Sequence, residues 1–180
     1  MPDLLVDPEV DKSPELFMVS FKHNTDISAQ PLYEPGGTLA EIRDRVTTFL
    51  RKYNEENPRQ KMDLVLFEDA IRHLLSINRL MEIPRSSGLL VGVGGSGKRS
   101  LTLLSAYISG AAMFQIAHSE GYGISQLKKD LRSLFLSAGQ QRRPTCFLFW
   151  QLESNFVEVI DSVLRTGTVP GGLFDPDELR

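Results

Sequence analysis

Apolar residues in the first half of the chain recur at helical spacing and predict two amphipathic helices. The first covers 39–53, where apolar side chains return every three or four positions. Thr38 and Glu41 have the spacing of a capping box, in which a hydroxyl and a carboxylate satisfy the free N–H groups at a helix start. After a polar break, a second apolar stripe begins near Asp63 and ends at Pro84, which cannot continue a helix.

The second half of the chain alternates short apolar runs with longer amphipathic stretches. The short runs are interpreted as buried strands and the longer stretches as helices, with Gly139 expected just after the end of one helix. Strict alternation of this kind predicts an α/β fold, a parallel sheet with flanking helices. The strands are expected at 88–93, 113–117 and 145–150, and the helices at 97–108, 124–138 and 156–164.

The residues that precede these elements lack a long periodic pattern. Prolines interrupt them repeatedly, they end in Gly36 and Gly37, and the only strand-like piece is 16–21. This composition favours an extended arm. We therefore expect three parts: an N-terminal arm at 1–37, a linker helix at 38–61, and an incomplete α/β domain at 62–180.

Composition narrows the classes of protein that remain. With 41% hydrophobic and 24% charged residues, the 180-residue chain is predicted to form a globular domain rather than a disordered one. A formal net charge of −3 argues against nucleic acid as a partner, and no apolar run is long enough to cross a membrane. The chain start lacks a signal-peptide pattern, and Cys146, the single cysteine, is expected to be a buried core residue. These features favour an intracellular, cytoplasmic location.

A glycine-rich segment between a predicted strand and a predicted helix carries the main candidate chemistry. It fits the phosphate-loop pattern G-x-x-x-x-G-K, in which glycines let the backbone curl and aim its N–H groups inward. The start of the next helix adds positive potential, and the lysine supplies a charge for the terminal phosphates. The alternative is a glycine-rich turn without a ligand. The segment consists of Gly92, Val93, Gly94, Gly95, Ser96, Gly97 and Lys98.

The position after the lysine departs from this pattern. A serine or threonine hydroxyl usually stands there and binds Mg²⁺, but this chain has Arg99. Ser100 follows one place later, and one helical residue turns a side chain by about 100°, which makes it a poor direct replacement. Phosphate binding to the backbone and Lys98 should survive, whereas the coordination of Mg²⁺ is left open.

The acidic residues that usually accompany such a loop are also missing. Hydrolysis normally needs carboxylates at the end of a second core strand, to hold Mg²⁺ and to activate water. The candidate strand ends at Trp150 and no aspartate follows it; Glu153 is the one nearby carboxylate and a weak candidate for a catalytic base. The three histidines show no metal-ligand spacing. Whether the chain is an enzyme is left open, and no metal site is predicted.

Several segments together resemble the fourth AAA+ module of a dynein heavy chain. They are more similar to the axonemal than to the cytoplasmic type. The similarity extends from about Pro31 to the end of the chain. It implies a P-loop NTPase fold of the AAA+ type in which Gly92 to Lys98 wraps the triphosphate of ATP, while Leu64 and Val65 lie near the adenine. The usual pair after the lysine in this module is Gln-Ser, so Arg99 departs from the family. The segments that carry the resemblance are 63–70, 77–79, 89–98, 114–116 and 121–124.

The resemblance also implies a setting for the chain. Members of this family are microtubule motors whose ring contains six AAA+ modules, and the fourth module binds ATP as a regulatory site. Expected partners are the other modules of the ring and dynein light and intermediate chains, in the cytoskeleton and the axoneme of a cilium or flagellum. The microtubule would be reached only through parts that this chain lacks. A complete large domain has five parallel strands, the fourth inserted between the first and third, and only three are readable here.

Two hypotheses of function follow. In the first, the chain is an ATP-binding AAA+ module with little or no hydrolysis. In the second, it is a non-catalytic interaction or assembly module that keeps the fold without using nucleotide. The glycines and Lys98 favour the first, whereas Arg99, the missing acid and the short sheet favour the second. A small P-loop kinase or GTPase is disfavoured, because no specificity motif follows the loop.

Overall fold

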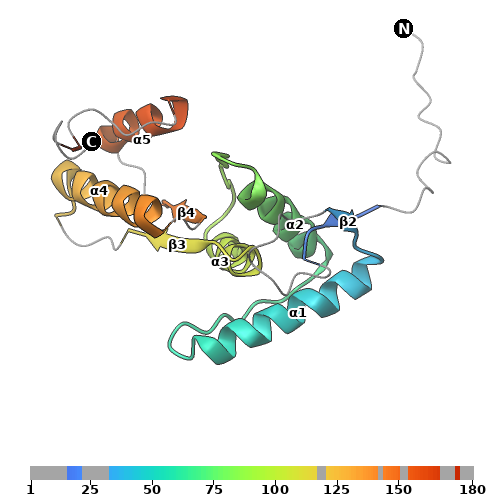
Figure 1. The fold of residues 1–180 in the computed structure, drawn as a ribbon. Helices are drawn as coiled ribbons and strands as arrows, with labels where there is room; N and C mark the ends of the chain where they lie inside the picture. Colours follow the sequence, from blue (N-terminus) through green and yellow to red (C-terminus); the bar gives the residue numbers. More distant parts are fainter. Residues whose placement is uncertain are drawn as a thin grey trace, which may run out of the picture.

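The computed structural model describes residues 16–21, 33–116, 121–141, 144–150, 154–166 and 173–174. Three helices form one group and two further helices another, with a short parallel sheet between them (Figure 1). In chain order the elements are β1 (Met18–Val19), β2 (Glu34–Pro35), α1 (Leu39–Glu56), α2 (Glu68–Glu82), α3 (Lys98–Ile108), β3 (Ala112–Gln115), α4 (Ile124–Gln141), β4 (Thr145–Leu148) and α5 (Ser154–Thr166).

Helix α1 begins where the sequence predicts. The Thr38 hydroxyl accepts a hydrogen bond from the backbone N–H of Glu41 at 3.3 Å, and the Glu41 carboxylate accepts one from the backbone N–H of Thr38 at 2.7 Å. The capping box is therefore confirmed. Because both residues satisfy each other's free N–H groups, the start of the helix is fixed locally. The helix then continues slightly beyond its predicted end, to Glu56.

Helix α2 begins later than predicted, at Glu68 instead of near Asp63. The Asn54 side chain explains the delay, because it bonds both backbone groups of Met62. Its oxygen accepts from the Met62 N–H at 2.7 Å, and its amide donates to the Met62 carbonyl at 2.9 Å. The chain after Met62 is thereby held against α1 in a non-helical conformation before α2 starts.

The strand-like piece near Val19 is extended, as predicted, and it also packs on the helices. Met18–Val19 pairs antiparallel with Glu34–Pro35, and Val19 and Phe21 are buried. Asn78 on α2 donates to the Ser20 hydroxyl at 3.4 Å. This part of the segment that was expected to be an extended arm thus contributes to a core.

The first core lies where α1, α2 and α3 meet. Each helix turns its apolar stripe inward, as its 3.6-residue period requires. The fully buried side chains at the centre of this core are Ile42, Val46, Ile71, Leu74 and Leu104.

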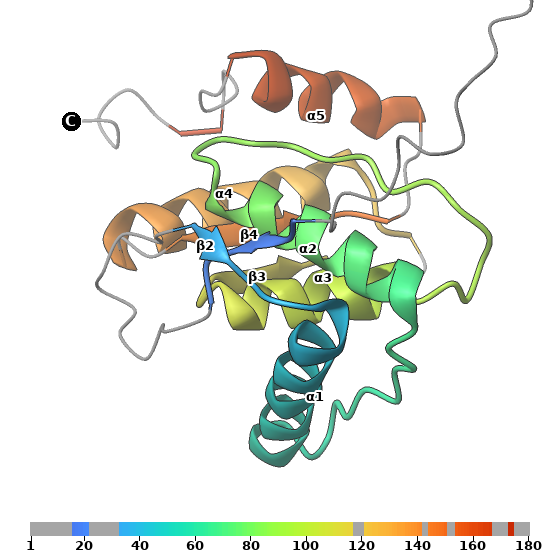
Figure 2. The same ribbon diagram turned by 90° about the vertical axis from the view of Figure 1, so that its right-hand side faces the viewer.

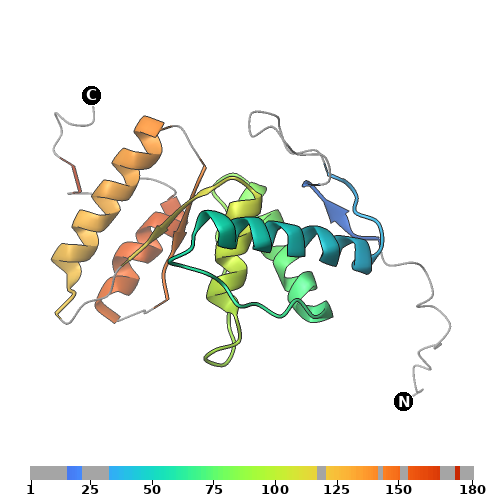
Figure 3. The same ribbon diagram turned by 90° about the horizontal axis from the view of Figure 1, so that it is seen from below.

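The second group of elements surrounds the parallel pair β3 and β4. Ala112 pairs with Thr145 and Gln115 with Leu148, so the carboxyl ends of the two strands lie together. Helices α4 and α5 lie on one side of this sheet and α1 to α3 on the other (Figure 3). In the side view, α5 and α1 lie on opposite sides of the molecule (Figure 2). A second apolar cluster fills this region, centred on Ile116, Leu127, Leu131 and Phe156.

Two sequence expectations in this half are wrong. Gly139 does not follow the end of a helix, because α4 continues through it to Gln141. The segment 88–93 is not a buried strand: Leu89, Val91 and Val93 are 88%, 85% and 78% exposed. Among the described residues no strand pairs with it, and β3 and β4 bond to each other instead. Figure 3 shows this yellow-green stretch as a loop that projects beyond α3.

Cys146 lies half-buried on β4 rather than fully in a core, and burial raises the pKa of its thiol. Within the described ranges, no helix has the length and apolar character needed to cross a membrane.

Candidate phosphate-binding site

The glycine-rich segment forms a loop that leads directly into α3. Gly95 and Gly97 both have φ of +77°, in the left-handed region where residues with a Cβ are strained. Gly97 is the N-cap of α3, and its carbonyl accepts the first helical bond from Leu101 at 2.8 Å. A helix leaves the N–H groups of its first turn without partners in the helix, so this end of α3 favours an anion.

Lys98 folds back over the loop. Its ammonium donates to the carbonyls of Gly92 at 2.8 Å and Val93 at 2.6 Å, and to the hydroxyl of Ser96 at 3.0 Å. These three oxygens match the three donors of an ammonium. The structure therefore brings together most of the residues predicted for the phosphate loop, with the lysine charge held at its centre.

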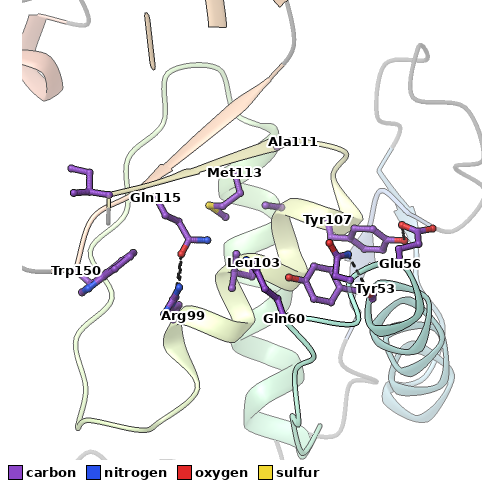
Figure 4. A pocket seen from close by; sticks show the side chains of 13 residues that line it. Tyr53, Glu56, Gln60, Arg99, Leu103, Tyr107, Ala111, Met113, Gln115 and Trp150 are labelled. Carbon is purple, nitrogen blue, oxygen red and sulfur yellow. Dashed lines mark hydrogen bonds between the residues drawn. The ribbon is translucent and has the colours of Figure 1, made fainter. Parts of the chain in front are cut away.

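Arg99 points elsewhere, to the carboxyl ends of the two strands (Figure 4). Its Nη2 and Nε donate to Oε1 of Gln115, the last residue of β3, at 2.8 and 3.2 Å. The guanidinium also stacks on the indole of Trp150, which lies just after β4, with 4.7 Å from its carbon to the ring centroid. Ser100 lies half-buried in the same turn of α3.

Sequence reasoning missed two members of this cluster, Gln115 and Trp150. Trp150 ends an apolar run, yet its side chain is 46% exposed and the Arg99 guanidinium stacks on it. The signal available was its position: it follows a predicted strand of a parallel sheet, where side chains from several strand ends meet. Gln115 gave no signal, because a glutamine inside an apolar run has no distinctive spacing.

A groove of about 1000 Å³ opens between α1, α3 and β3 (Figure 4). Arg99, Gln115 and Trp150 line one end of it, and Glu56 and Tyr107 the other. The Tyr107 hydroxyl donates to the Glu56 carboxylate at 2.7 Å. Burial, together with this bond and the negative charge of Glu56, raises the pKa of Tyr107 to about 12. The groove is therefore cationic near the phosphate loop and acidic at its far end.

The residues expected near an adenine ring are not brought to this groove. Leu64 packs against the first core and lines a smaller hollow of about 380 Å³ beside α1, which no residue of the phosphate loop lines. Val65 is 76% exposed. Their role in binding a base stays a prediction.

The two protein groups that usually hold magnesium beside a P-loop are not found among the described residues. Those groups are a hydroxyl directly after the lysine and a carboxylate at a strand end, which bind Mg²⁺ together with phosphate oxygens and water. In the part of the chain that the structure describes, no three His, Cys, Asp or Glu side chains gather where they could hold a metal. Arg99 instead places a positive charge at the strand ends. Glu153, the weak candidate for a catalytic base, lies outside the described residues.

Comparisons with a family model and with individual proteins point to the same family. A family model described as P-loop containing dynein motor region D4 matches residues 62–180. Dynein axonemal heavy chain 5 of Rattus norvegicus is 42% identical over 158 residues, which cover 86% of this chain and 4% of that protein. Dynein axonemal heavy chain 9 of Homo sapiens is 41% identical over 182 residues, covering 99% of this chain and 4% of that protein. The chain spans about 4% of the length of these curated relatives.

Proposed function

This chain belongs to the P-loop-containing dynein motor region D4 family, and from that premise we propose that residues 92–98 bind the phosphates of ATP. Membership of a P-loop motor-region family implies nucleotide binding. The groups that we propose to contact the phosphates are the backbone N–H groups of the loop, the first turn of α3, and Lys98.

The arrangement of Lys98 is the observation that carries this proposal. Its ammonium is held inside the loop by three oxygens that a phosphate oxygen can replace as acceptors. The left-handed conformations of Gly95 and Gly97 turn the backbone just before the helix start. The loop, Lys98 and the N-terminus of α3 thus meet at one place, where all three stabilise a bound anion.

Binding without appreciable turnover is the chemistry that these residues support. Hydrolysis needs a group that takes a proton from water, and a well-placed carboxylate usually does this. In this chain the strand β4 is followed by Phe149 and Trp150, not by an acid. The proposed role is therefore regulatory: occupancy of the loop by ATP, rather than its cleavage, would alter the module.

The wider setting is also a proposal, because the chain covers a small part of its relatives. We place it as the fourth AAA+ module of an axonemal dynein heavy chain, in a cilium or flagellum. Its partners there would be the neighbouring modules of the ring and, through the rest of the heavy chain, light and intermediate chains and the microtubule. The two relatives named above are both axonemal heavy chains, which supports this placement.

A second candidate function rests on the exposed segment 89–93. Leu89, Val91 and Val93 are apolar and exposed, and no described strand bonds to them. Such an edge can pair with a strand of another polypeptide. An assembly module that binds through this segment would need no nucleotide.

Equilibrium binding of labelled ATP to the 180-residue chain decides between these functions. We expect Lys98→Ala to weaken binding roughly tenfold or more, because a charged hydrogen-bond donor to phosphate is lost. Lys129→Ala, which removes an exposed lysine from α4, is the matched control and should bind as the unaltered chain does. Equal binding by the Lys98 variant and the unaltered chain would reject the phosphate-loop proposal and favour the assembly module.

A further inference from the structure

We propose that Arg99 replaces the magnesium ion at this site, so that the loop binds a nucleoside triphosphate free of metal. This inference rests on the proposed function and specifies the form of the ligand. P-loop sites normally hold Mg²⁺ with a hydroxyl directly after the lysine and an acid after a core strand, whereas this chain has Arg99 at the first position and, among the described residues, no acid at the end of β4.

The first observation that supports this inference is the position of Arg99 in the chain. It directly follows Lys98 in the first turn of α3, where P-loop proteins carry the hydroxyl that binds Mg²⁺. The arginine side chain is longer than that of serine or threonine, so its positive charge lies beyond the position that the hydroxyl would occupy. The guanidinium therefore extends to the strand ends, where the missing acid would have held the other side of the metal.

The anchoring of the guanidinium is the second step. Gln115 accepts from Nη2 and Nε, and Trp150 covers one face. The group is thereby fixed in orientation but still exposed to solvent. Among the described residues, these bonds engage two of the five N–H donors of an arginine. The others suit the oxygens of a phosphate chain, which guanidinium groups bind through paired hydrogen bonds.

Charge balance is the third step. Metal-free ATP is more negative than its magnesium complex, so a site for it needs more positive charge of its own. Lys98 and Arg99 supply two adjacent cations, and the N-terminus of α3 adds a positive dipole end. A divalent cation placed among them would instead be repelled by Arg99, with no described cluster of carboxylates to offset the repulsion.

Binding of ATP to the full chain in magnesium buffer and in EDTA tests this inference. We expect the unaltered chain to bind several-fold more tightly in EDTA than in magnesium buffer, because Mg²⁺ complexes the phosphates that Arg99 would otherwise contact. Arg99→Gln should weaken binding in EDTA roughly tenfold, because a charge-assisted contact to phosphate is lost. Arg99→Lys, which keeps the charge, should recover part of the loss.

The control is Arg132→Gln, which removes another exposed arginine that stacks on an aromatic ring, Phe174, at 5.4 Å. It should bind ATP as the unaltered chain does, and circular dichroism should show that all variants fold. Binding that is as tight in magnesium as in EDTA, or tighter, or an Arg99→Gln variant that binds as tightly as the unaltered chain in EDTA, would overturn the inference while leaving the proposed function intact. Absence of ATP binding in both buffers would overturn the proposed function itself, and this inference with it.

Discussion

The helical region, α1 to α3, and the sheet region, β3 to α5, bury their side chains to different degrees. At the centre of the first lie Ile42, Val46, Leu74 and Leu104, each with an exposed fraction of 0%. Every described residue of β3 and β4 is only half-buried, and the segment 89–93, which was expected to pair with them, is exposed. A helix satisfies its own backbone and needs only one covered face, whereas a parallel strand needs neighbours on both sides. The phosphate loop joins the unpaired segment to α3, and Arg99, the next residue, contacts Gln115 of β3.

The largest expected effect is in the helical core. Leu74→Ala should lower the free energy of unfolding by about 2–5 kcal/mol, because a fully buried leucine leaves a cavity. Val91→Ala, in the exposed segment, should change it by less than about 0.5 kcal/mol. Urea unfolding of both variants measures the contrast. Similar losses in the two variants would show that 89–93 is packed in solution and would remove the difference between the regions.

A second prediction concerns the backbone of the phosphate loop. Gly97→Ala should cost about 1–2 kcal/mol, because φ of +77° is strained for any residue with a Cβ. Gly94→Ala is the matched control: its φ is not in that region, and an added Cβ would meet no atom within 4 Å. Thermal unfolding should therefore separate the two glycines. Equal stability would mean that the loop is not held in this conformation.

A third prediction tests how locally the helical region is specified. Thr38→Ala should destabilise the chain by about 1 kcal/mol, since the capping box at the start of α1 is lost. Thr48→Ala, on the exposed side of the same helix, should have a smaller effect. Loss of helical circular dichroism on heating would report both. A cap variant as stable as the unaltered chain would show that packing alone fixes the start of α1.

The smallest effect is expected in the groove that joins the two regions. The pKa of Tyr107 is about 12 in the folded chain against an ordinary value of 10.0, with burial as the largest cause. The folded state therefore holds this proton more tightly than the unfolded state. The stability that this proton supplies is present below pH 10 and is lost as the pH rises toward 12.

Ultraviolet titration of tyrosinate, with Tyr107→Phe subtracted, measures this pKa. Glu56→Gln should lower it only in part, because burial remains when the negative charge is removed. A pKa unchanged by this substitution would mean that Glu56 does not contact Tyr107 in solution.

Much of the helical region could be predicted from the sequence because its signals are local. The capping box at Thr38 and the apolar stripe of α1 lie within a few residues of one another, and both are confirmed. The start of α2 could not be predicted, because it depends on bonds from Asn54 to Met62 across a loop. The expected strand at 88–93 failed for the opposite reason: its apolar run is genuine, but no described strand pairs with it.

The candidate site also combines features with local sequence signals and features that depend on contacts between distant residues. The pattern from Gly92 to Lys98 predicted a glycine-rich loop that leads directly into a helix, because glycine placement and helix start lie next to each other in the sequence. The bonds from Lys98 to the carbonyls of that loop could not be read from the pattern. The direction of Arg99 could not be predicted, because Gln115 ends β3 and Trp150 lies just after β4, and only the fold brings these two places together. The sequence could show that a metal-binding hydroxyl was replaced, but not what the replacement contacts.

Phosphorus NMR of ATP mixed with the chain tests the central claim most directly, because it observes the phosphates themselves. If residues 92–98 hold the triphosphate, the β and γ resonances will shift or broaden with the unaltered chain and with Lys129→Ala, but far less with Lys98→Ala. Resonances that stay unchanged with the unaltered chain, or that change equally with the Lys98 variant, would contradict the claim that this loop binds the phosphates.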